Sequence, residues 1–333
     1  MKHAFVTGSA GFIGYHLSRQ LLDDGWRVTG LDNLSPYYDP SLKRRRHDLL
    51  REAGAFAPVI EDVATPDTVR SLLEADPADA VIHLAAQAGV RHSIDAPRDY
   101  VTANLQGTFE VLEAARATPP KHLLIASTSS VFGAETGMPY RETQKADTQM
   151  SFYAATKKAG EAMAHSYAHL YRIPTTMFRF FTVYGPWGRP DMALFKFVAA
   201  ILRGDPIDVY NHGKMRRDFT YVTDLVAGLA QLIDVPPGKT PVSGRDSLSP
   251  VAPHRVVNIG NGETVELGRF IDAIETALGQ KAERNLMPMQ PGDVPATWAE
   301  TGLLSDLLGK PLPHTDVETG VAAFVDWYRT EYA

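Results

Sequence analysis

The sequence contains no cysteine. This absence excludes disulfide bonds, thiolate nucleophiles and cysteine-ligated metal sites, and it favours a reducing compartment such as the cytoplasm. The 11 histidines form no H-E-x-x-H or related pattern, so we expect no catalytic metal. The start of the chain has no apolar run long enough for a signal peptide or a membrane span. We therefore expect a cytoplasmic protein without membrane attachment.

Neither sign of charge is in large excess. Lys and Arg number 33 against 39 for Asp and Glu, which gives a net charge of -6. This balance argues against non-specific binding to nucleic acid, although local basic groups can still hold a small anionic ligand. With 333 residues, of which 44% are hydrophobic, the chain is long enough for one large domain or two coupled domains with a sizeable core.

Short apolar runs alternate with segments of helical periodicity through the first half of the chain. We predict strands at residues 4–7, 27–31, 58–61, 80–84, 121–127 and 175–180. We predict helices at residues 11–24, 100–118 and 152–171. This alternation predicts an α/β fold with a Rossmann-type, doubly wound parallel sheet. The carboxyl ends of all strands in such a sheet meet at one edge, where a ligand binds.

The rhythm changes after about residue 185, where proline and glycine become frequent. We predict helices at 192–202, 223–233 and 267–278, and a surface loop at 236–253. The sequence therefore predicts a first domain over residues 1–180. A smaller, mixed α/β region over 181–333 caps this domain and can return segments to it.

A glycine-rich turn lies between the first predicted strand and the first predicted helix. Gly8, Gly11 and Gly14 are spaced as G-x-x-G-x-x-G, and Asp32 follows the next strand. Glycines allow a tight turn and close approach of a pyrophosphate, which the amides and the dipole of the following helix stabilise. Asp32 would accept hydrogen bonds from ribose hydroxyls and repel a 2′-phosphate. The turn predicts a dinucleotide site that prefers NAD to NADP; the alternative is a glycine turn in an unrelated α/β protein.

Tyr153 and Lys157 open a predicted helix, and their separation of four residues places both side chains on one face. An unperturbed tyrosine has a pKa near ~10, so it needs a neighbouring positive charge to act as a base at neutral pH. Taken alone, the pair is better explained as an exposed Tyr and Lys on an amphipathic helix. It follows, however, a strand that ends in the hydroxyl-rich run 127–130, at the predicted ligand edge. For Ser127, capping that turn is as good an explanation as binding.

Together, the glycine spacing, the hydroxyl run and the Tyr/Lys pair resemble the extended short-chain dehydrogenase/reductase family. The resemblance implies that Tyr153 is the catalytic base, that Lys157 assists it, and that Thr128 bonds the sugar hydroxyl being oxidised. It also implies a tightly bound NAD that is regenerated in each turnover. The cofactor-binding positions that it implies are Gly8, Gly11, Phe12, Ile13, Gly14, Asp32, Asn33, Lys43, Asp62, Val63, Leu84, Ala85, Ala86, Asn104, Tyr153 and Lys157.

Four segments resemble the UDP-glucuronate 4-epimerases within that family: residues 31–40, 180–193, 215–222 and 289–294. The resemblance covers essentially the whole chain, and residues 187–193 are its most specific part. It implies interconversion of UDP-glucuronate and UDP-galacturonate through a transient 4-keto intermediate. In this interpretation the first domain binds NAD and the second mainly the sugar nucleotide. A homodimer through the two long helices is implied, although packing on the sheet explains their apolar stripes equally well.

The same resemblance implies a set of substrate contacts. Arg189 is the candidate carboxylate clamp, since a guanidinium pairs with a carboxylate as a fork; the alternative is a surface arginine in a Gly/Pro loop. Most of the basic run 43–46 is better explained as a solvated helix face, with Lys43 reaching the NAD phosphates. The implied substrate-binding positions are Thr128, Ser129 and Ser130 for the sugar, Thr182 and Arg189 for the carboxylate, Arg217 for the diphosphate, Tyr210 for uracil and Asp293 for ribose.

Two alternatives remain open and two are disfavoured. A UDP-uronate decarboxylase uses the same Tyr and Lys, and a 4-epimerase can act on a neutral or N-acetylated UDP-sugar instead. A sugar-nucleotide dehydratase is disfavoured, because the run 127–130 lacks the Asp-Glu pair that dehydratases carry beside the Ser/Thr position. A non-catalytic NAD-binding protein on the same fold is disfavoured because Thr128, Tyr153 and Lys157 are present together.

Overall fold

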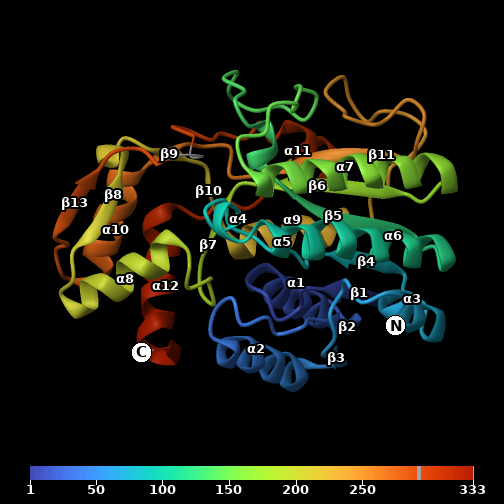
Figure 1. Cartoon of the computed structure of the whole chain (residues 1–333), viewed down its shortest axis with the longest axis horizontal. Helices are drawn as coiled ribbons and strands as arrows, with labels where there is room; N and C mark the ends of the chain where they lie inside the picture. Colours follow the sequence, from blue (N-terminus) through green and yellow to red (C-terminus); the bar gives the residue numbers. More distant parts are fainter. Residues whose placement is uncertain (291–293, 333) are drawn as a thin grey trace.

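The computed structural model describes residues 1–290 and 294–332. Its centre is a seven-stranded sheet with the order β11-β6-β5-β4-β1-β2-β3 (Figure 1), and each neighbouring pair is parallel. The strands are β1 (His3–Thr7), β2 (Arg27–Leu31), β3 (Phe56–Val59), β4 (Ala80–His83), β5 (His122–Thr128), β6 (Thr175–Phe180) and β11 (His254–Ile259). The predicted Rossmann-type α/β fold is confirmed. The last strand comes from the second half of the chain, so both halves build the sheet.

The third strand differs from the prediction. It was expected at 58–61 but β3 spans Phe56–Val59, so Pro58 lies inside it. Proline cannot donate to a strand ladder and is tolerated at the edge of a sheet. β3 is an edge strand whose one neighbour in the sheet is β2. Its position at the edge therefore explains how the strand begins before the proline.

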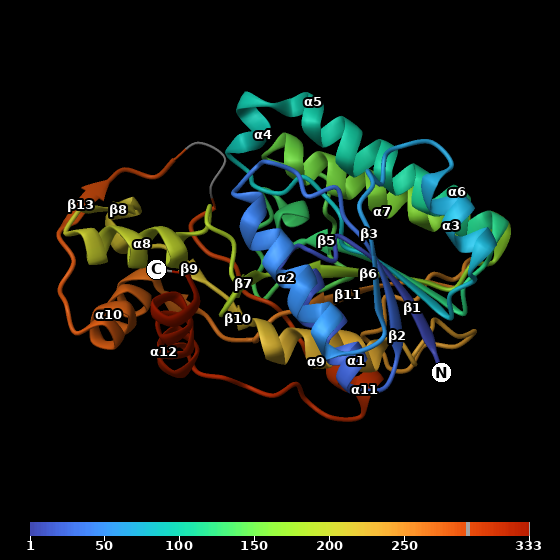
Figure 2. The same ribbon diagram turned by 90° about the horizontal axis from the view of Figure 1, so that it is seen from below.

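Helices cover both faces of the sheet (Figure 2). The helices of one face are α1 (Phe12–Asp23), α2 (Pro40–Ala53), α9 (Val222–Leu232) and α11 (Gly302–Leu308); those of the other face are α3 (Thr68–Ala75), α6 (Gly107–Ala117) and α7 (Phe152–Tyr171). Within the described ranges, no helix is both long and apolar enough to cross a bilayer.

Side chains of each strand alternate between two hydrophobic cores. In β1, Ala4 and Val6 pack in the core beneath α1 and α9, whereas Phe5 packs in the core beneath α3 and α6. A parallel sheet buried on both faces needs apolar residues at successive positions, which is why the strands are continuous apolar runs. Helix α9, predicted at 223–233, packs against α1 although its sequence belongs to the second half.

The helix predicted at 100–118 is present but not uniform. The chain runs through α4 (His92–Asp95), α5 (Pro97–Tyr100) and a π-helical turn (Val101–Gln106) before α6 begins. Wide turns of this kind are frequent at functional sites. Asn104 lies in the π-helical turn, where it donates to the Gln87 carbonyl at 3.1 Å and to the Thr156 hydroxyl at 3.0 Å. It thereby ties this helix to α7 and to the loop after β4.

The remaining elements form a smaller lobe beside the carboxyl edge of the sheet, on the left of Figure 1. Its helices are α8 (Ala193–Arg203), α10 (Leu267–Leu278) and α12 (Val317–Trp327), and its strand pairs are β7 (Thr182–Tyr184) with β10 (Phe219–Tyr221), β8 (Ile207–Tyr210) with β13 (Arg284–Met287), and β9 (Arg216–Arg217) with β12 (Val265–Glu266). The predicted helices at 192–202 and 267–278 correspond to α8 and α10. An aromatic core that includes Phe219 and Phe270, stacked at 4.1 Å, holds the lobe together.

Candidate active site

A cavity of about 300 Å³ follows the carboxyl edge of the sheet. It extends from the glycine-rich turn to the hydroxyl run, the start of α7 and the loop after β7. The predicted site residues that line it are Gly8, Gly11, Phe12, Ile13, Gly14, Asp32, Asn33, Lys43, Asp62, Val63, Leu84, Ala85, Ala86, Thr128, Tyr153, Lys157 and Arg189. One continuous cavity therefore joins the predicted dinucleotide site to the predicted redox residues.

The glycine-rich turn is shaped for close approach of a ligand. Gly8 has a φ of +74°, and a Cβ there would lie 2.7 Å from the backbone nitrogen of Ala85. A Cβ at Gly14 would overlap the Gly8 carbonyl, so α1 packs directly on the turn. Gly11 precedes α1 without a side-chain cap, which leaves the first amides of the helix available to an anion. This cradle fits the pyrophosphate of NAD.

Two carboxylates lie beyond the turn. Asp32 is buried at the end of β2 and accepts hydrogen bonds from the amides of Ala10 at 3.1 Å and Leu34 at 2.8 Å. Asp62 accepts from the Asn33 side chain at 2.8 Å. Acceptors fixed in this way suit ribose hydroxyls and disfavour a 2′-phosphate. These acceptors therefore fit NAD, which would lie along the cavity from Asp62 to Lys157.

Tyr153 lies in the first turn of α7. Ser151 caps this helix, since its hydroxyl accepts from the amide of Ala154 at 3.1 Å. Burial raises the pKa of Tyr153, against the lowering effects of its hydrogen bond with Thr128 and the charge of Arg189. With protein groups alone, Tyr153 therefore stays protonated at neutral pH. The positive charge of a bound nicotinamide is needed to lower the pKa of Tyr153 toward the physiological range.

Burial also lowers the pKa of Lys157 to about 8, against the raising effect of Glu161. Glu161 is four residues further along α7 and was missed by the sequence analysis, although the i, i+4 spacing from Lys157 was a usable signal. Arg179 donates to both of its oxygens at 2.8 Å, and Ser127 donates to Oε1 at 2.7 Å. Although burial opposes it, Arg179 lowers the pKa of Glu161 to about 2. This permanent carboxylate helps to keep Lys157 protonated.

The hydroxyl-rich run 127–130 is split between the end of β5 and the turn that follows it. Thr128 is the last residue of the strand and lines the cavity, whereas Ser129 and Ser130 begin a 3-10 turn (Ser129–Phe132) outside the cavity lining. Ser130 donates its amide to the Thr128 hydroxyl at 3.2 Å. Ser127 lines the cavity and its hydroxyl donates to Glu161, whereas the side chain that caps the turn is that of Thr128.

Arg189 lies in the loop after β7, beside the cavity. This loop is docked on the cofactor side of the molecule. His16 of α1 donates from Nε2 to the Pro186 carbonyl at 2.8 Å, and burial, against the effect of this hydrogen bond, lowers the pKa of His16 to about 4. Tyr15 packs on Trp187 with 5.5 Å between ring centroids. The candidate carboxylate clamp is therefore held by the helix that follows the glycine-rich turn.

Only two of the four residues in the basic run 43–46 face solvent. Arg44 and Arg45 are exposed, but Lys43 and Arg46 are buried. Lys43 donates to the Ser35 carbonyl at 3.0 Å, and burial lowers its pKa. Arg46 donates to the carbonyl of Ala10 at 2.7 Å and to that of Trp187 at 2.6 Å. Arg46 therefore ties the glycine-rich turn to the Arg189 loop, a role that the sequence analysis missed.

Replacing Arg46 by methionine should lower the free energy of unfolding by about 2–4 kcal/mol, because the buried carbonyls of Ala10 and Trp187 lose their donor. Urea unfolding measures this change. Arg45→Met is the matched control, since Arg45 is the exposed neighbour on α2, and it should alter stability by less than about 0.5 kcal/mol. Equal stability of the two variants would contradict the bridging role.

Besides Ser129 and Ser130, four predicted residues lie away from the cavity lining. Asn104 supports the wall from behind, through Gln87 and Thr156. Thr182 lies in β7 and lines a smaller apolar cavity that also borders Arg189. Tyr210 ends β8, where the guanidinium of Arg91 lies 4.6 Å above its ring. Arg217 lies in β9, where it donates to the Arg216 carbonyl at 3.0 Å.

Asp293 lies outside the described residues. Within residues 1–290 and 294–332, no group of three or more His, Asp or Glu side chains is arranged to hold a metal ion.

The sheet order, the glycine cradle and the paired Tyr153 and Lys157 define an enzyme of the extended short-chain dehydrogenase/reductase class. The model of the NAD dependent epimerase/dehydratase family matches residues 4–244, and the chain belongs to that family.

Individual relatives carry names that are more specific than the family description. A probable UDP-glucuronate 4-epimerase of Rhizobium meliloti is 53% identical over 98% of this chain and 97% of its own length. UDP-glucuronate 4-epimerase 4 of Arabidopsis thaliana is 44% identical over 98% of this chain and 75% of its own length. The structure of UDP-glucuronic acid 4-epimerase from Bacillus cereus in complex with UDP-glucuronic acid and NAD superposes with a TM-score of 0.87, at 31% identity, over 99% of this chain and 100% of that one. These matches confirm the resemblance stated from the sequence.

Proposed function

We propose that this protein is an NAD-dependent isomerase that interconverts UDP-glucuronate and UDP-galacturonate by inverting carbon 4. The observation that carries the proposal is the cavity itself, which places the glycine cradle, the Thr128–Tyr153–Lys157 group and Arg189 around one space. The same reaction is named for the relatives that cover nearly the whole chain.

The catalytic work of this chain is the movement of one proton. The glycine cradle with Asp32 and Asp62 would hold NAD, which would supply the acceptor and donor for the hydride of carbon 4. Tyr153 removes the proton of the 4-hydroxyl and gives it back, while Thr128 hydrogen-bonds that hydroxyl and Lys157 favours the tyrosinate. The 4-keto sugar turns between the two hydride transfers, so carbon 4 is inverted and no net oxidation occurs.

Arg189 is the group proposed to distinguish a uronate from a neutral sugar. A guanidinium binds a carboxylate through two parallel hydrogen bonds, and Arg189 borders the same cavity as Tyr153. The 4-keto intermediate of a uronate is a β-keto acid, which readily loses carbon dioxide. An epimerase must therefore hold the carboxylate in an orientation that disfavours this loss, whereas a decarboxylase favours it.

The remaining substrate contacts are proposed from the family resemblance. Ser129 and Ser130 bind the sugar, Thr182 supports the carboxylate, Arg217 the diphosphate, Tyr210 uracil and Asp293 ribose. Of the five positions in this set that the structure describes, the small lobe carries three, which is consistent with a sugar-nucleotide site between a domain at 1–180 and a region at 181–333. We propose Lys43 as the contact to the NAD phosphates and Asn104 as the support of the cofactor wall.

Incubation of the purified protein with UDP-glucuronate, followed by chromatographic separation of the products, tests the proposal. The expected product is UDP-galacturonate at the same oxidation level, without added NADH. A UDP-pentose as the main product would identify a decarboxylase instead. No conversion of UDP-glucuronate, with conversion of UDP-glucose or a UDP-N-acetylhexosamine, would identify a 4-epimerase of another sugar.

We also propose a cytoplasmic homodimer. Helices α6 and α7 contact each other, and together with the π-helical turn before α6 they expose large apolar side chains: Val101, Phe109, Phe152, Leu170 and Tyr171. A second copy pairing these two helices would bury this surface, and the absence of cysteine suits a reducing compartment. Light scattering after gel filtration tests the dimer, with Phe109→Glu as the disruptive variant.

A further inference from the structure

The Arg189 guanidinium is already engaged on one of its edges. Its Nε donates to Oδ1 of Asp191 at 3.0 Å and its Nη2 donates to Oδ2 at 2.5 Å. The side chains are only 23% and 22% exposed, so the pair is well shielded from water. A two-residue separation along one loop and two parallel hydrogen bonds fix both the position and the plane of the guanidinium.

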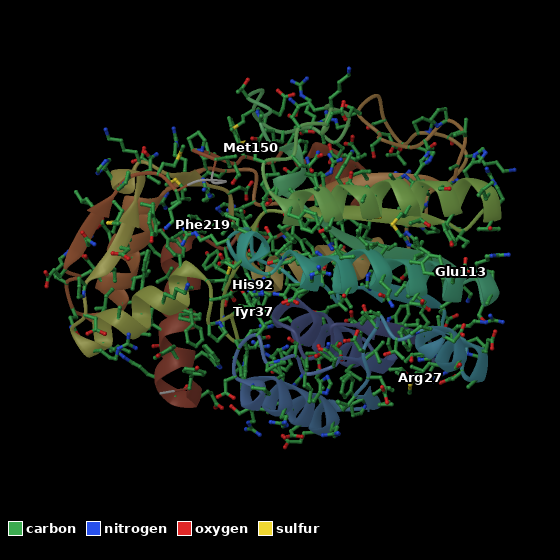
Figure 3. The ribbon with its side chains drawn as sticks, in the orientation of Figure 1. Arg27, Tyr37, His92, Glu113, Met150 and Phe219 are labelled. Atoms are coloured by element: carbon green, nitrogen blue, oxygen red, sulfur yellow. The ribbon has the colours of Figure 1, made fainter. Side chains whose placement is uncertain are left out.

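Asp191 is itself held from the cofactor side. The Tyr37 hydroxyl donates to Oδ2 of Asp191 at 3.3 Å, and Tyr37 lies in the loop that follows Asp32. The ring of Tyr37 packs at 4.8 Å from that of His92, the first residue of α4, and the two lie side by side in Figure 3. Two segments far from residue 191 in the sequence therefore keep its carboxylate in place.

Asp191 occupies the Nε/Nη2 edge of the guanidinium, and its contact does not use Nη1. The edge formed by Nη1 and the second hydrogen of Nη2 can still take a carboxylate in a fork. Arg189 is also near enough to Tyr153 to favour its tyrosinate form. A carboxylate on the Nη1/Nη2 edge would thus be bound at a fixed angle relative to the group that reacts at carbon 4.

We propose that Asp191, supported by Tyr37, is a positioning residue that orients Arg189 and thereby suppresses loss of carbon dioxide from the 4-keto uronate. This inference rests on the proposed epimerase function and deepens it. The Arg189–Asp191 pair, rather than Arg189 alone, then determines whether the 4-keto intermediate is epimerised or decarboxylated.

The chemistry of the side reaction explains why orientation matters. In decarboxylation the bond between carbons 5 and 6 breaks, and its electron pair moves through carbon 5 to the 4-keto oxygen. Carbon dioxide leaves, and carbon 5 then takes up a proton. The breaking bond must lie parallel to the π orbitals of the ketone, so a carboxylate held in another orientation is protected. Freedom of the guanidinium restores the reactive orientation during part of each turnover.

Asp191→Asn tests the inference, because an amide is nearly the size of the carboxylate but loses its charge and one of its two acceptors. We expect kcat for epimerisation to fall about tenfold and the ratio of UDP-pentose, or its 4-keto precursor, to UDP-galacturonate to rise about tenfold or more. Tyr37→Phe should shift the product ratio in the same direction by a smaller factor. Chromatography of the nucleotide products, with trapping of carbon dioxide, measures both quantities.

The chain supplies a matched control. Arg203 and Asp205 form the same Arg-x-Asp ion pair at 2.8 Å on the exposed surface, so Asp205→Asn should leave kcat and product ratio unchanged. Melting temperature and retained NAD show whether each variant is folded. Tyr37→Phe keeps the test decisive if Asp191→Asn does not fold.

Two results would overturn the positioning role. One is an Asp191→Asn enzyme with the kcat and product ratio of the wild type. The other is a lower KM for UDP-glucuronate with unchanged kcat and product ratio, which would mean that Asp191 merely competes with the substrate carboxylate. A wild-type protein that fails to epimerise UDP-glucuronate would instead contradict the proposed function, so the two failures are distinguishable.

Discussion

Tyr153→Phe should lower kcat for epimerisation by about 10²–10⁴-fold while the protein keeps its NAD and its fold. The change removes the hydroxyl that carries the proton, and general acid–base groups contribute about that factor. The glycine cradle and the two carboxylates beyond it are untouched, so cofactor binding should persist. Steady-state kinetics with UDP-glucuronate, together with NAD content from the absorbance of the released cofactor, measures both expectations.

Tyr171→Phe provides the comparison for this variant. Tyr171 lies on the same helix α7 but is 40% exposed and packs beside Tyr167 and Arg116. Its kcat should stay within about twofold of the wild type, as for most surface substitutions. If Tyr153→Phe retained comparable activity, another group would have to carry the proton, and the proposed mechanism would be wrong.

Arg189→Ala should reduce kcat/KM for UDP-glucuronate by about 10²–10⁴-fold. Two charge-assisted hydrogen bonds to a shielded carboxylate contribute about 1.5–3 kcal/mol each, and each 1.4 kcal/mol corresponds to a factor of ten. A neutral UDP-hexose lacks the carboxylate, so its low basal turnover should change far less. Competition kinetics with UDP-glucuronate and UDP-glucose as alternative substrates measures the change in discrimination directly.

The Arg189→Ala variant also removes the partner of Asp191, which adds a repulsive charge to the site. Comparing it with Arg189→Ala combined with Asp191→Asn separates this repulsion from the loss of the clamp. Arg203→Ala, in the exposed Arg-x-Asp pair, is the surface control. If discrimination between the two substrates were unchanged in both Arg189 variants, the uronate clamp would lie elsewhere.

Much of the sheet follows from local patterns. β1, the glycine-rich turn and α1 are contiguous, and their apolar periodicity and turn residues suffice to predict them. β11 was not predicted, because its six residues form a strand by pairing with β6, some 80 residues earlier in the chain. The π-helical turn before α6 was also not predictable, since it accompanies contacts of Asn104 with two distant segments.

The candidate site likewise has features that the sequence predicts and features that it does not. Thr128 ends β5, and Tyr153 and Lys157 lie in the first two turns of α7, so the topology of the sheet predicts that all three lie at its carboxyl edge. The orientation of Arg189 was not predictable, because Asp191 is held by Tyr37 from a segment 154 residues away. Arg46 was likewise hidden in a basic run, since the carbonyl of Trp187 that it binds is 141 residues distant. Hydrogen bonds between segments far apart in the sequence therefore determine the features of the site that local patterns do not predict.

The central claim is that carbon 4 is oxidised and then reduced again by the same hydride. UDP-glucuronate carrying deuterium at carbon 4 tests it, with the product examined by NMR and mass spectrometry. The account predicts UDP-galacturonate that keeps the deuterium at carbon 4, formed in ordinary water without uptake of solvent hydrogen into the sugar. Loss of the deuterium to solvent, or inversion at another carbon, would contradict it.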